Sequence, residues 1–234
     1  MLNQTTKHHP RGESGCGCEL TLAEAVARVS LISSRMSEKS DTPVYLISGA
    51  GTAAGHLVVQ RLLAYDVRLV LLSRYGDLEK TIQKTATYNA ERMLFFRMDP
   101  SRASWLKLIA RSVAERWGPI DGIVSIADFE GGSSIKKLSH HQLQMQLRRN
   151  LFAPAALVHA MLPVFTPQPL IVLAPSADHA SPGSAISTEG LRGFARSLES
   201  EMPSARVRFL EPGDAAQMAD GIMDLIASRL NAGL

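Results

Sequence analysis

Short apolar runs alternate with stretches of helical periodicity along most of the chain, and this alternation is typical of parallel α/β proteins. The pattern predicts six strands, at residues 44–48, 68–72, 93–97, 122–127, 170–174 and 207–210. It predicts helices between and after them, at about residues 57–63, 78–88, 105–117, 139–162, 185–202 and 215–230. Because strands and helices alternate, we expect a doubly wound, Rossmann-type α/β/α fold with strand order 3-2-1-4-5-6.

The length and composition agree with one globular domain rather than two. The chain has 234 residues, of which 45% are hydrophobic, and this suffices for one three-layer core. We assign residues 43–234 to a single domain and residues 1–42 to a flexible arm with an amphipathic helix. The apolar positions of that helix are Leu20, Leu22, Val26, Val29, Ile32 and Met36. Two roles for it stay open, which are packing on the domain and contact with a second subunit or a partner protein.

Charge and hydropathy argue against several classes of partner. The formal net charge is +3 and the basic residues are scattered, so we expect no nucleic-acid binding. No apolar stretch is long enough to span a bilayer and no signal-peptide core is present, so we expect a cytoplasmic protein without membrane contact. Cys16 and Cys18 follow His8 and His9, but their spacing is not a standard zinc pattern, and we predict no metal site.

A glycine-rich turn at residues 48–55 (Ser-Gly-Ala-Gly-Thr-Ala-Ala-Gly) joins the first predicted strand to the first helix. Glycine lets a backbone approach a pyrophosphate closely, and the free N–H groups at a helix start attract its charge, so this context predicts a dinucleotide site. The second strand leads into Ser73-Arg74, where an NAD-preferring protein would carry an acidic residue for the ribose. Arg74 at this place favours NADP(H), because it can pair with a 2′-phosphate; the alternative is an arginine in a solvated loop.

From about residue 43 to residue 213 the sequence resembles the short-chain dehydrogenase/reductase family. The resemblance rests on Ser48-Gly49 and Gly55 with Ala53 at the turn's middle glycine, Asp99 after the third strand, Asn150 in the long helix, Ser176 after the fifth strand, and Pro212-Gly213 after the sixth. It implies a cofactor site made of Ser48, Gly49, Gly51, Thr52, Ala53, Gly55, Arg74, Asp99, Ala127, Pro212 and Gly213. It also implies that Asn150 and Ser176 keep two positions of the family's catalytic set.

The same alignment places Ser184 and Thr188 at the positions of the family's catalytic tyrosine and lysine. Misalignment does not explain this, because the last tyrosine of the chain is Tyr88 and the last lysine is Lys137. In the family mechanism a lysine cation makes a tyrosine, with an ordinary pKa of about 10, acidic enough to deliver a proton as hydride moves. A serine hydroxyl is a far weaker acid and threonine carries no charge. We therefore expect the family's chemistry to be absent.

The predicted cofactor site also departs from the family pattern. Ala53 adds a methyl group where close backbone approach is wanted, and Asp128 stands where the family has a glycine. An inward-pointing carboxylate there would repel a pyrophosphate. Arg74 and Asp99 are retained, and NADP(H) is the cofactor that they favour.

Family members usually continue through a substrate-covering loop to a seventh strand. Here residues 215–230 fit one amphipathic helix, with Met218, Ile222, Leu225 and Ile226 on its apolar face. The resemblance therefore implies a shortened C-terminal region with little or no lid. It also implies an exposed sheet edge, which the N-terminal helix could cover.

Three functions stay open. The first is a catalytically degenerate family member that binds NADP(H) as a regulatory protein, and dimerises through the helices at about 139–162 and 185–202 as the family usually does. The second is an NADPH-dependent oxidoreductase of carbonyls or alcohols, with an atypical proton path through Ser176, Asn150 and water. The third is a structural partner subunit that binds no cofactor.

Overall fold

The computed structural model describes residues 42–85, 88–127, 134–175 and 181–231. In these ranges the chain forms one six-stranded sheet in the order β3-β2-β1-β4-β5-β6, and all neighbouring strands are parallel. The strands are β1 (Val44–Ser48), β2 (Arg68–Ser73), β3 (Met93–Arg97), β4 (Ile120–Ile126), β5 (Phe165–Ala174) and β6 (Arg206–Phe209). The predicted Rossmann-type sheet and its strand order are confirmed. The expected N-terminal helix, Asp128 and Ser176 lie outside the described residues.

The central strands are apolar on both sides because helices cover both faces of the sheet. Every residue of β1 is buried, and Leu46 is paired with Val70 of β2 and with Ile123 of β4. Near-continuous apolar sequence is the mark of such doubly covered parallel strands. The pairing also places the carboxyl ends of the strands along one edge, where Ser48 is opposite Leu72 and Ser125. The loops that follow the strands therefore meet at that edge.

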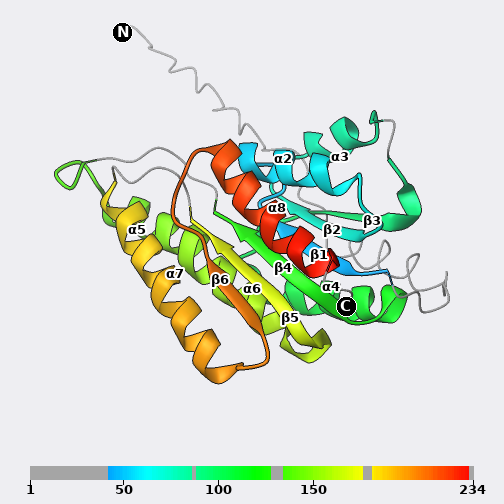
Figure 1. Cartoon of the computed structure of the whole chain (residues 1–234). Helices are drawn as coiled ribbons and strands as arrows, with labels where there is room; N and C mark the ends of the chain where they lie inside the picture. The colour runs from blue at the N-terminus through cyan, green and yellow to red at the C-terminus, as the bar shows by residue number, and fades with distance from the viewer. Residues whose placement is uncertain (1–41, 86–87, 128–133, 176–180, 232–234) are drawn as a thin grey trace, which may run out of the picture.

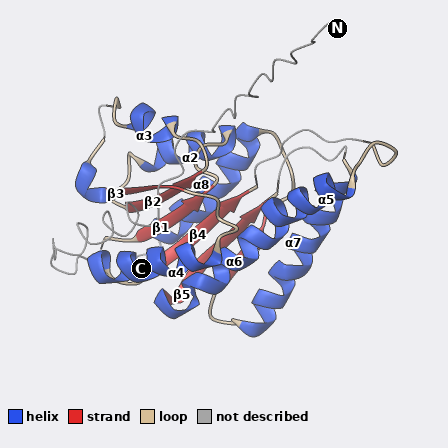
Figure 2. Cartoon of the chain, turned by 180° about the vertical axis from the view of Figure 1, so that it is seen from behind, coloured by secondary structure: helices blue, strands red, loops and turns tan. Residues whose placement is uncertain are grey.

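Helices form one layer on each face of the sheet. The first layer, with α8 in front in Figure 1, contains α2 (Ala53–Leu62), α3 (Asp77–Ile82) and α8 (Ala215–Asn231). The second layer, in front in Figure 2, contains α4 (Ala103–Trp117), α6 (Ala153–Met161) and α7 (Pro182–Glu201). The helix α5 (His140–Leu147) runs through the π-helical turn η2 (Arg148–Phe152) into α6. Two short 3-10 turns are η1 (Ala90–Arg92) and η3 (Leu162–Val164).

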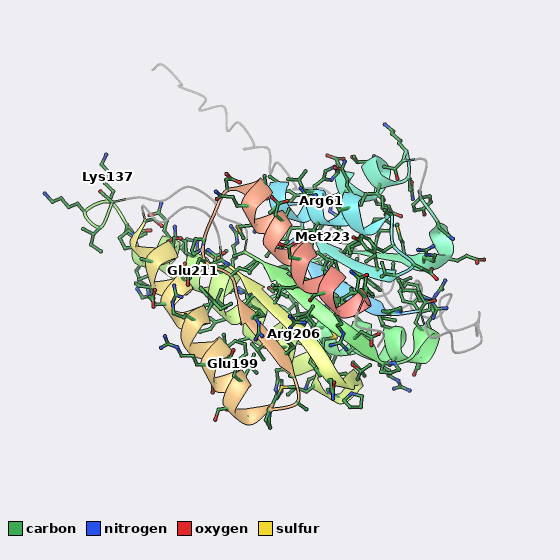
Figure 3. All side chains as sticks on the ribbon, in the orientation of Figure 1. Arg61, Lys137, Glu199, Arg206, Glu211 and Met223 are labelled. Atoms are coloured by element: carbon green, nitrogen blue, oxygen red, sulfur yellow. The ribbon has the colours of Figure 1, made fainter. Side chains whose placement is uncertain are left out.

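Helix α8 packs against α2 and closes the core on its face of the sheet. Met218, Ile222 and Ile226 are buried along one side of α8, at the spacing of a helix that faces a core. Arg61 of α2 lies beside α8 in Figure 3, and its Nη1 is 2.5 Å from Oδ1 of Asp220. The predicted C-terminal helix is thus confirmed. Within the described ranges, no helix is long and apolar enough to cross a membrane.

Two predicted elements differ in extent. Helix α3 ends at Ile82 rather than near residue 88, because the backbone N–H and the Oγ1 of Thr85 both donate to the Ile82 carbonyl and turn the chain. Strand β5 begins at Phe165 rather than at residue 170, since Phe165 already pairs with Ile120 of β4. The register shifts between Ile120 and Gly122, beside the two prolines in the first half of β5. Proline has no N–H group and is unusual within a sheet, so the sequence pattern does not indicate this half of the strand.

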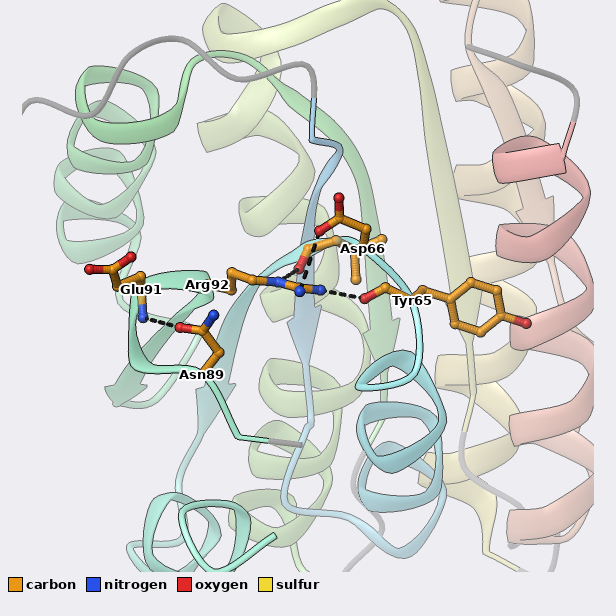
Figure 4. Close-up of polar contacts among 6 residues, drawn as sticks. Tyr65, Asp66, Asn89, Glu91 and Arg92 are labelled. Carbon is orange, nitrogen blue, oxygen red and sulfur yellow. Dashed lines mark hydrogen bonds and ion pairs between the residues drawn. The ribbon is translucent and has the colours of Figure 1, made fainter. Parts of the chain in front are cut away.

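Arg92 ties the entrance of β3 to the loop before β2, at the edge of the sheet opposite the carboxyl ends (Figure 4). Its Nη2 donates to the Tyr65 carbonyl at 2.5 Å, its Nε donates to the Val67 carbonyl at 3.3 Å, and its Nη1 lies 3.3 Å from Oδ1 of Asp66. Charge-assisted hydrogen bonds to carbonyl groups hold a loop firmly. Arg92 therefore fixes the starts of β2 and β3. Arg74 and Asp99 follow the other ends of these two strands.

Candidate functional site

A pocket lies at the carboxyl ends of β1 to β4, at the crevice where a doubly wound sheet binds ligands. Seven of the predicted cofactor residues line it, which are Ser48, Gly49, Gly51, Thr52, Arg74, Asp99 and Ala127. Four others, Ala53, Gly55, Pro212 and Gly213, are not part of its wall. The wall also contains residues that the sequence did not indicate, among them Tyr75, Ser125 and Arg149.

The turn after β1 has no room for a side chain at its three glycines. Gly49 has a φ of +78°, and a Cβ there would lie 2.2 Å from the Ile126 carbonyl oxygen. A Cβ at Gly51 would lie 2.4 Å from Oγ of Ser73, and one at Gly55 2.2 Å from the carbonyl oxygen of Gly49. Backbone and short side chains therefore pack directly against the turn. The N–H groups of Gly49 and Ala50 donate to the Leu72 carbonyl, and that of Thr52 donates to the Gly49 carbonyl.

Helix α2 begins at the pocket with a well-formed cap. Oγ1 of Thr52 accepts a hydrogen bond from the Gly55 N–H at 3.0 Å and donates one to the Gly49 carbonyl at 2.8 Å. Ala53 is the first helical residue and is exposed, whereas Gly55 is buried beneath the turn. The methyl of Ala53 therefore meets no steric limit within the described residues, and Gly55 shapes the turn rather than the pocket wall.

Arg74 and Tyr75 form the wall beyond β2. The Arg74 guanidinium carbon lies 5.8 Å from the centroid of the Tyr75 ring, a cation–π distance. Oγ of Ser73 accepts a hydrogen bond from the Tyr75 N–H at 3.0 Å, which fixes the backbone after the strand. Tyr75 is 47% exposed, and its Cδ2 comes near the place where a Gly51 Cβ would be. Arg74 thus stands at the pocket on an ordered segment.

Asp99, after β3, is held in its charged form. Burial disfavours the charge, but hydrogen bonds from Ser101 and the positive charges of Arg148 and Arg74 outweigh it, so the pKa of Asp99 is lowered. The backbone N–H of Ser101 donates to Oδ1 of Asp99 at 2.9 Å, and Nε of Arg148 donates to Oγ of Ser101 at 3.0 Å. A carboxylate in this state can accept hydrogen bonds from an adenosine moiety, but cannot donate one.

The π-helical turn η2 interrupts the predicted long helix at the candidate catalytic asparagine. Asn150 is 4% exposed, and its Oδ1 has no hydrogen-bond partner. Its neighbour Arg149 lines the pocket. Turns of this type are frequent at functional sites. The sequence reasoning missed Arg149, although the pair of arginines just before Asn150 could have indicated it.

Ser184 and Thr188 lie in the interior, on α7. Their exposed fractions are 2% and 6%, and neither lines the pocket. A Cβ at Gly183 would lie 1.7 Å from Oε1 of Gln146, so the start of α7 packs directly on α5. The nearest basic residue further along α7 is Arg192. Arg192 is therefore the only cation of α7 within one helical turn of Thr188.

Arg192 is engaged elsewhere. Its guanidinium makes a two-pronged contact with the Glu211 carboxylate, and its Cζ lies 4.4 Å from the centroid of the Phe209 ring. The hydrogen bonds that Arg192 donates to Glu211 are the main cause that raises the pKa of Arg192. The segment after β6, which includes Pro212 and Gly213, is thereby attached to α7. Among the residues of the described ranges, no group of three or more His, Cys, Asp or Glu side chains is arranged to hold a metal ion.

Comparison with known proteins identifies the class of this protein. Residues 43–216 match the family model of the short chain dehydrogenases, and the chain belongs to that family. No curated protein sequence matches it significantly.

Solved structures show the same fold. A short-chain dehydrogenase/reductase (glucose/ribitol dehydrogenase) from Brucella melitensis is 20% identical, with a TM-score of 0.67 over 74% of this chain and 73% of that chain. An alcohol dehydrogenase from Thermococcus sibiricus, complexed with 5-hydroxy-NADP, is 20% identical, with a TM-score of 0.68 over 80% and 91%. ElxO with NADP bound is 16% identical, with a TM-score of 0.65 over 72% of both chains. At these identities the likeness concerns the fold alone.

Proposed function

We propose that this protein binds NADP(H) in the pocket at the ends of β1 to β4 and does not carry out hydride transfer by the family's tyrosine and lysine mechanism. One observation carries the proposal. The glycine turn and Arg74 meet in one pocket, while Ser184 and Thr188 are buried in α7, away from its wall.

The residues of the pocket fit a phosphorylated adenosine. The three glycines of the turn leave no space for a Cβ, so a pyrophosphate can come close to the backbone and to the start of α2, whose first N–H groups attract an anion. Arg74 can pair with a 2′-phosphate and Asp99 can accept hydrogen bonds from the adenosine. Bound NADPH would supply a hydride; the chain's own residues described here bind and orient its adenosine end.

At the positions of the family's tyrosine and lysine, the residue types provide no proton donor. A protein acid that works near neutral pH needs a pKa close to that range, and an aliphatic hydroxyl such as that of Ser184 is far from it. Thr188 brings no cation, and Arg192 is occupied by Glu211 and Phe209. We infer a regulatory or partner role, in which nucleotide binding itself is the function.

A second candidate function is an NADPH-dependent reductase with an atypical proton path. Asn150 favours it, because its buried Oδ1 has no hydrogen-bond partner and could hold a water molecule. A third candidate, a partner subunit that binds no cofactor, is supported by the loss of the family's Tyr and Lys and would be indicated by a stable complex that is independent of nucleotide.

We also propose that the chain forms a homodimer through α5, α6 and α7, as the family resemblance implies. Two large apolar side chains of this layer are exposed, which are Phe152 at 59%, at the end of η2 directly before α6, and Ile186 of α7 at 48%. Exposed aromatic and aliphatic side chains on neighbouring helices are typical of an interface core. A partner protein at the N-terminal helix is a further proposal.

Calorimetric titration with NADPH and NADH tests the proposed function. We expect NADPH to bind, and Arg74→Ala to weaken NADPH about tenfold or more without changing NADH, because a charge-assisted pair contributes about 1.5–3 kcal/mol. Arg111→Ala is the matched control, since Arg111 forms an exposed pair with Glu115 on α4 and should leave binding unchanged. Absence of NADPH binding at millimolar concentration would refute the proposal and favour the partner subunit.

A further inference from the structure

Most of the pocket wall comes from the first half of the sheet, because ten of its sixteen lining residues lie on or just after β1, β2 and β3. A doubly wound fold contains two mononucleotide-binding halves, and a dinucleotide lies across both. The walls of the pocket come from the ends of β1, β2, β3 and β4 and from η2 and α6. In the described part of the chain, no residue of β5, of α7 or of the segment after β6 lines it. We assign this space to the adenosine half of a dinucleotide, because β1 to β3 supply most of its described wall.

Helix α7 packs closely at the other half. Ser184 and Ser187 are each 2% exposed, and Thr188 is 6% exposed, so these side chains are shielded from solvent, and none of them lines the pocket. Oγ of Ser187 donates to the Gly183 carbonyl at 2.7 Å, which ties it to its own helix. Small residues let α7 approach its neighbours, where a tyrosine and a lysine would need more room. The described residues thus give the nicotinamide end of a dinucleotide little to contact.

Arg149 brings a second cation into the pocket. It lies on η2, in the helical layer over β4, whereas Arg74 follows β2 on the other side of β1. The neighbouring Arg148 contacts Ser101, which in turn donates to Asp99. The pocket therefore presents two arginines and one carboxylate. Guanidinium groups bind phosphate oxygens in pairs, so this arrangement suits an adenosine that carries phosphate at two separate positions.

We infer that the pocket recognises only the phosphorylated adenosine half of NADP(H), with Arg74 and Arg149 as its two phosphate-recognising residues. Adenosine 2′,5′-bisphosphate therefore binds as tightly as NADPH, and the protein does not distinguish NADPH from NADP. The inference rests on the proposed function, and it specifies which part of the nucleotide that site reads. A protein of this kind responds to the total NADP(H) pool rather than to its redox state.

Calorimetric titration of the full chain with four ligands tests the inference. These are NADPH, NADP, adenosine 2′,5′-bisphosphate and reduced nicotinamide mononucleotide. We expect the first three to bind within about threefold of one another, a difference below about 1 kcal/mol. Reduced nicotinamide mononucleotide should neither bind nor displace the bisphosphate. If NADPH binds tenfold tighter than the bisphosphate, the inference is wrong and the proposed function stands. If none of the four binds, both are wrong.

Two variants test the role of each arginine. Arg149→Ala should weaken both adenosine 2′,5′-bisphosphate and adenosine 5′-monophosphate by about tenfold, because it removes a charge-assisted contact to the shared phosphate. Arg74→Ala should weaken only the bisphosphate. Arg111→Ala, with its exposed pair on α4, should change neither. Unaltered affinity in Arg149→Ala would contradict the assignment of Arg149 as a phosphate-recognising residue. Titration with adenosine 3′,5′-bisphosphate tests whether the phosphate at the 2′ position is the one recognised.

Discussion

The fit of Gly55 against the glycine turn predicts opposite effects for one substitution at two helical glycines. Gly55 lies in α2, and a Cβ there would lie 2.2 Å from the Gly49 carbonyl oxygen and 2.9 Å from Cα of Ala50. Both obstacles are backbone atoms and cannot rotate away. Gly221 lies in α8, and its Cβ would meet the methyl groups of Leu210 at 3.6 and 3.7 Å, which is ordinary contact.

The expected magnitudes follow from two opposing terms. Alanine is favoured over glycine in a helix by about 1 kcal/mol at both sites. Overpacking costs about 1–3 kcal/mol, and the upper part of that range applies against backbone atoms that cannot move, so Gly55→Ala should lower the free energy of unfolding by about 1–2 kcal/mol. Gly221→Ala should raise it by about 0.5–1 kcal/mol. In a domain of this size, 1 kcal/mol shifts the melting temperature by about 2–4 °C.

Urea denaturation followed by circular dichroism measures both variants against the unmodified chain. Nucleotide titration of the same samples shows whether the turn keeps its shape, and Gly55→Ala should also lose NADPH binding. The reasoning would be refuted if Gly55→Ala were as stable as the unmodified chain, or if Gly221→Ala were the less stable of the two. Either result would show that the turn does not pack on α2 as described.

Three further predictions concern the cap, the titration of the partly buried carboxyl group of Asp121 and the dimer. Thr52→Ala should cost about 1 kcal/mol in thermal unfolding, whereas Thr52→Ser should retain most of that stability, because a hydroxyl still caps the Gly55 N–H. Burial raises the pKa of Asp121 above its usual 3.8, despite a hydrogen bond from the Val44 N–H and the charge of Arg229. The native state thus holds this proton more tightly than the unfolded state, so the free energy of unfolding should fall as pH rises from 3.8 through the raised pKa. Urea titrations at several pH values measure this fall, and Asp121→Asn should remove it. An unchanged pH dependence in Asp121→Asn would contradict the prediction. Phe152→Asp should shift the chain from dimer to monomer in analytical ultracentrifugation, and a dimer that survives would show that the interface lies elsewhere.

The sequence predicts the fold well because its strands are apolar on both faces. β1 and β2 are wholly buried, and their short apolar runs carry a clear signal. β5 is recognised only from residue 170 onward, since its earlier half contains Pro167 and Pro169 and pairs with β4 across a register shift. The end of α3 depends on a turn made by Thr85, which no periodicity reveals.

The candidate site is predictable where it lies on local motifs and not where it depends on tertiary packing. The glycine turn and Arg74 are adjacent to predicted strands, so their meeting at one edge follows from the topology. Arg149 reaches the pocket from a π-helical turn, and a pattern of ordinary helix gives no sign of that turn. Pro212 and Gly213 match the family's sequence, yet they lie outside the pocket wall. Their assignment to a cofactor stays a prediction.

The central claim is that the chain binds NADPH without using it as a hydride donor. The most direct test follows the fluorescence of NADPH as protein is added to saturation, and then after a panel of aldehydes and ketones is added to the bound nucleotide. The account predicts a saturable change on binding that Arg74→Ala weakens, and then a constant signal with every carbonyl compound. A steady loss of the reduced-nicotinamide signal, dependent on protein and on one of the carbonyl compounds, would contradict it and identify a working reductase.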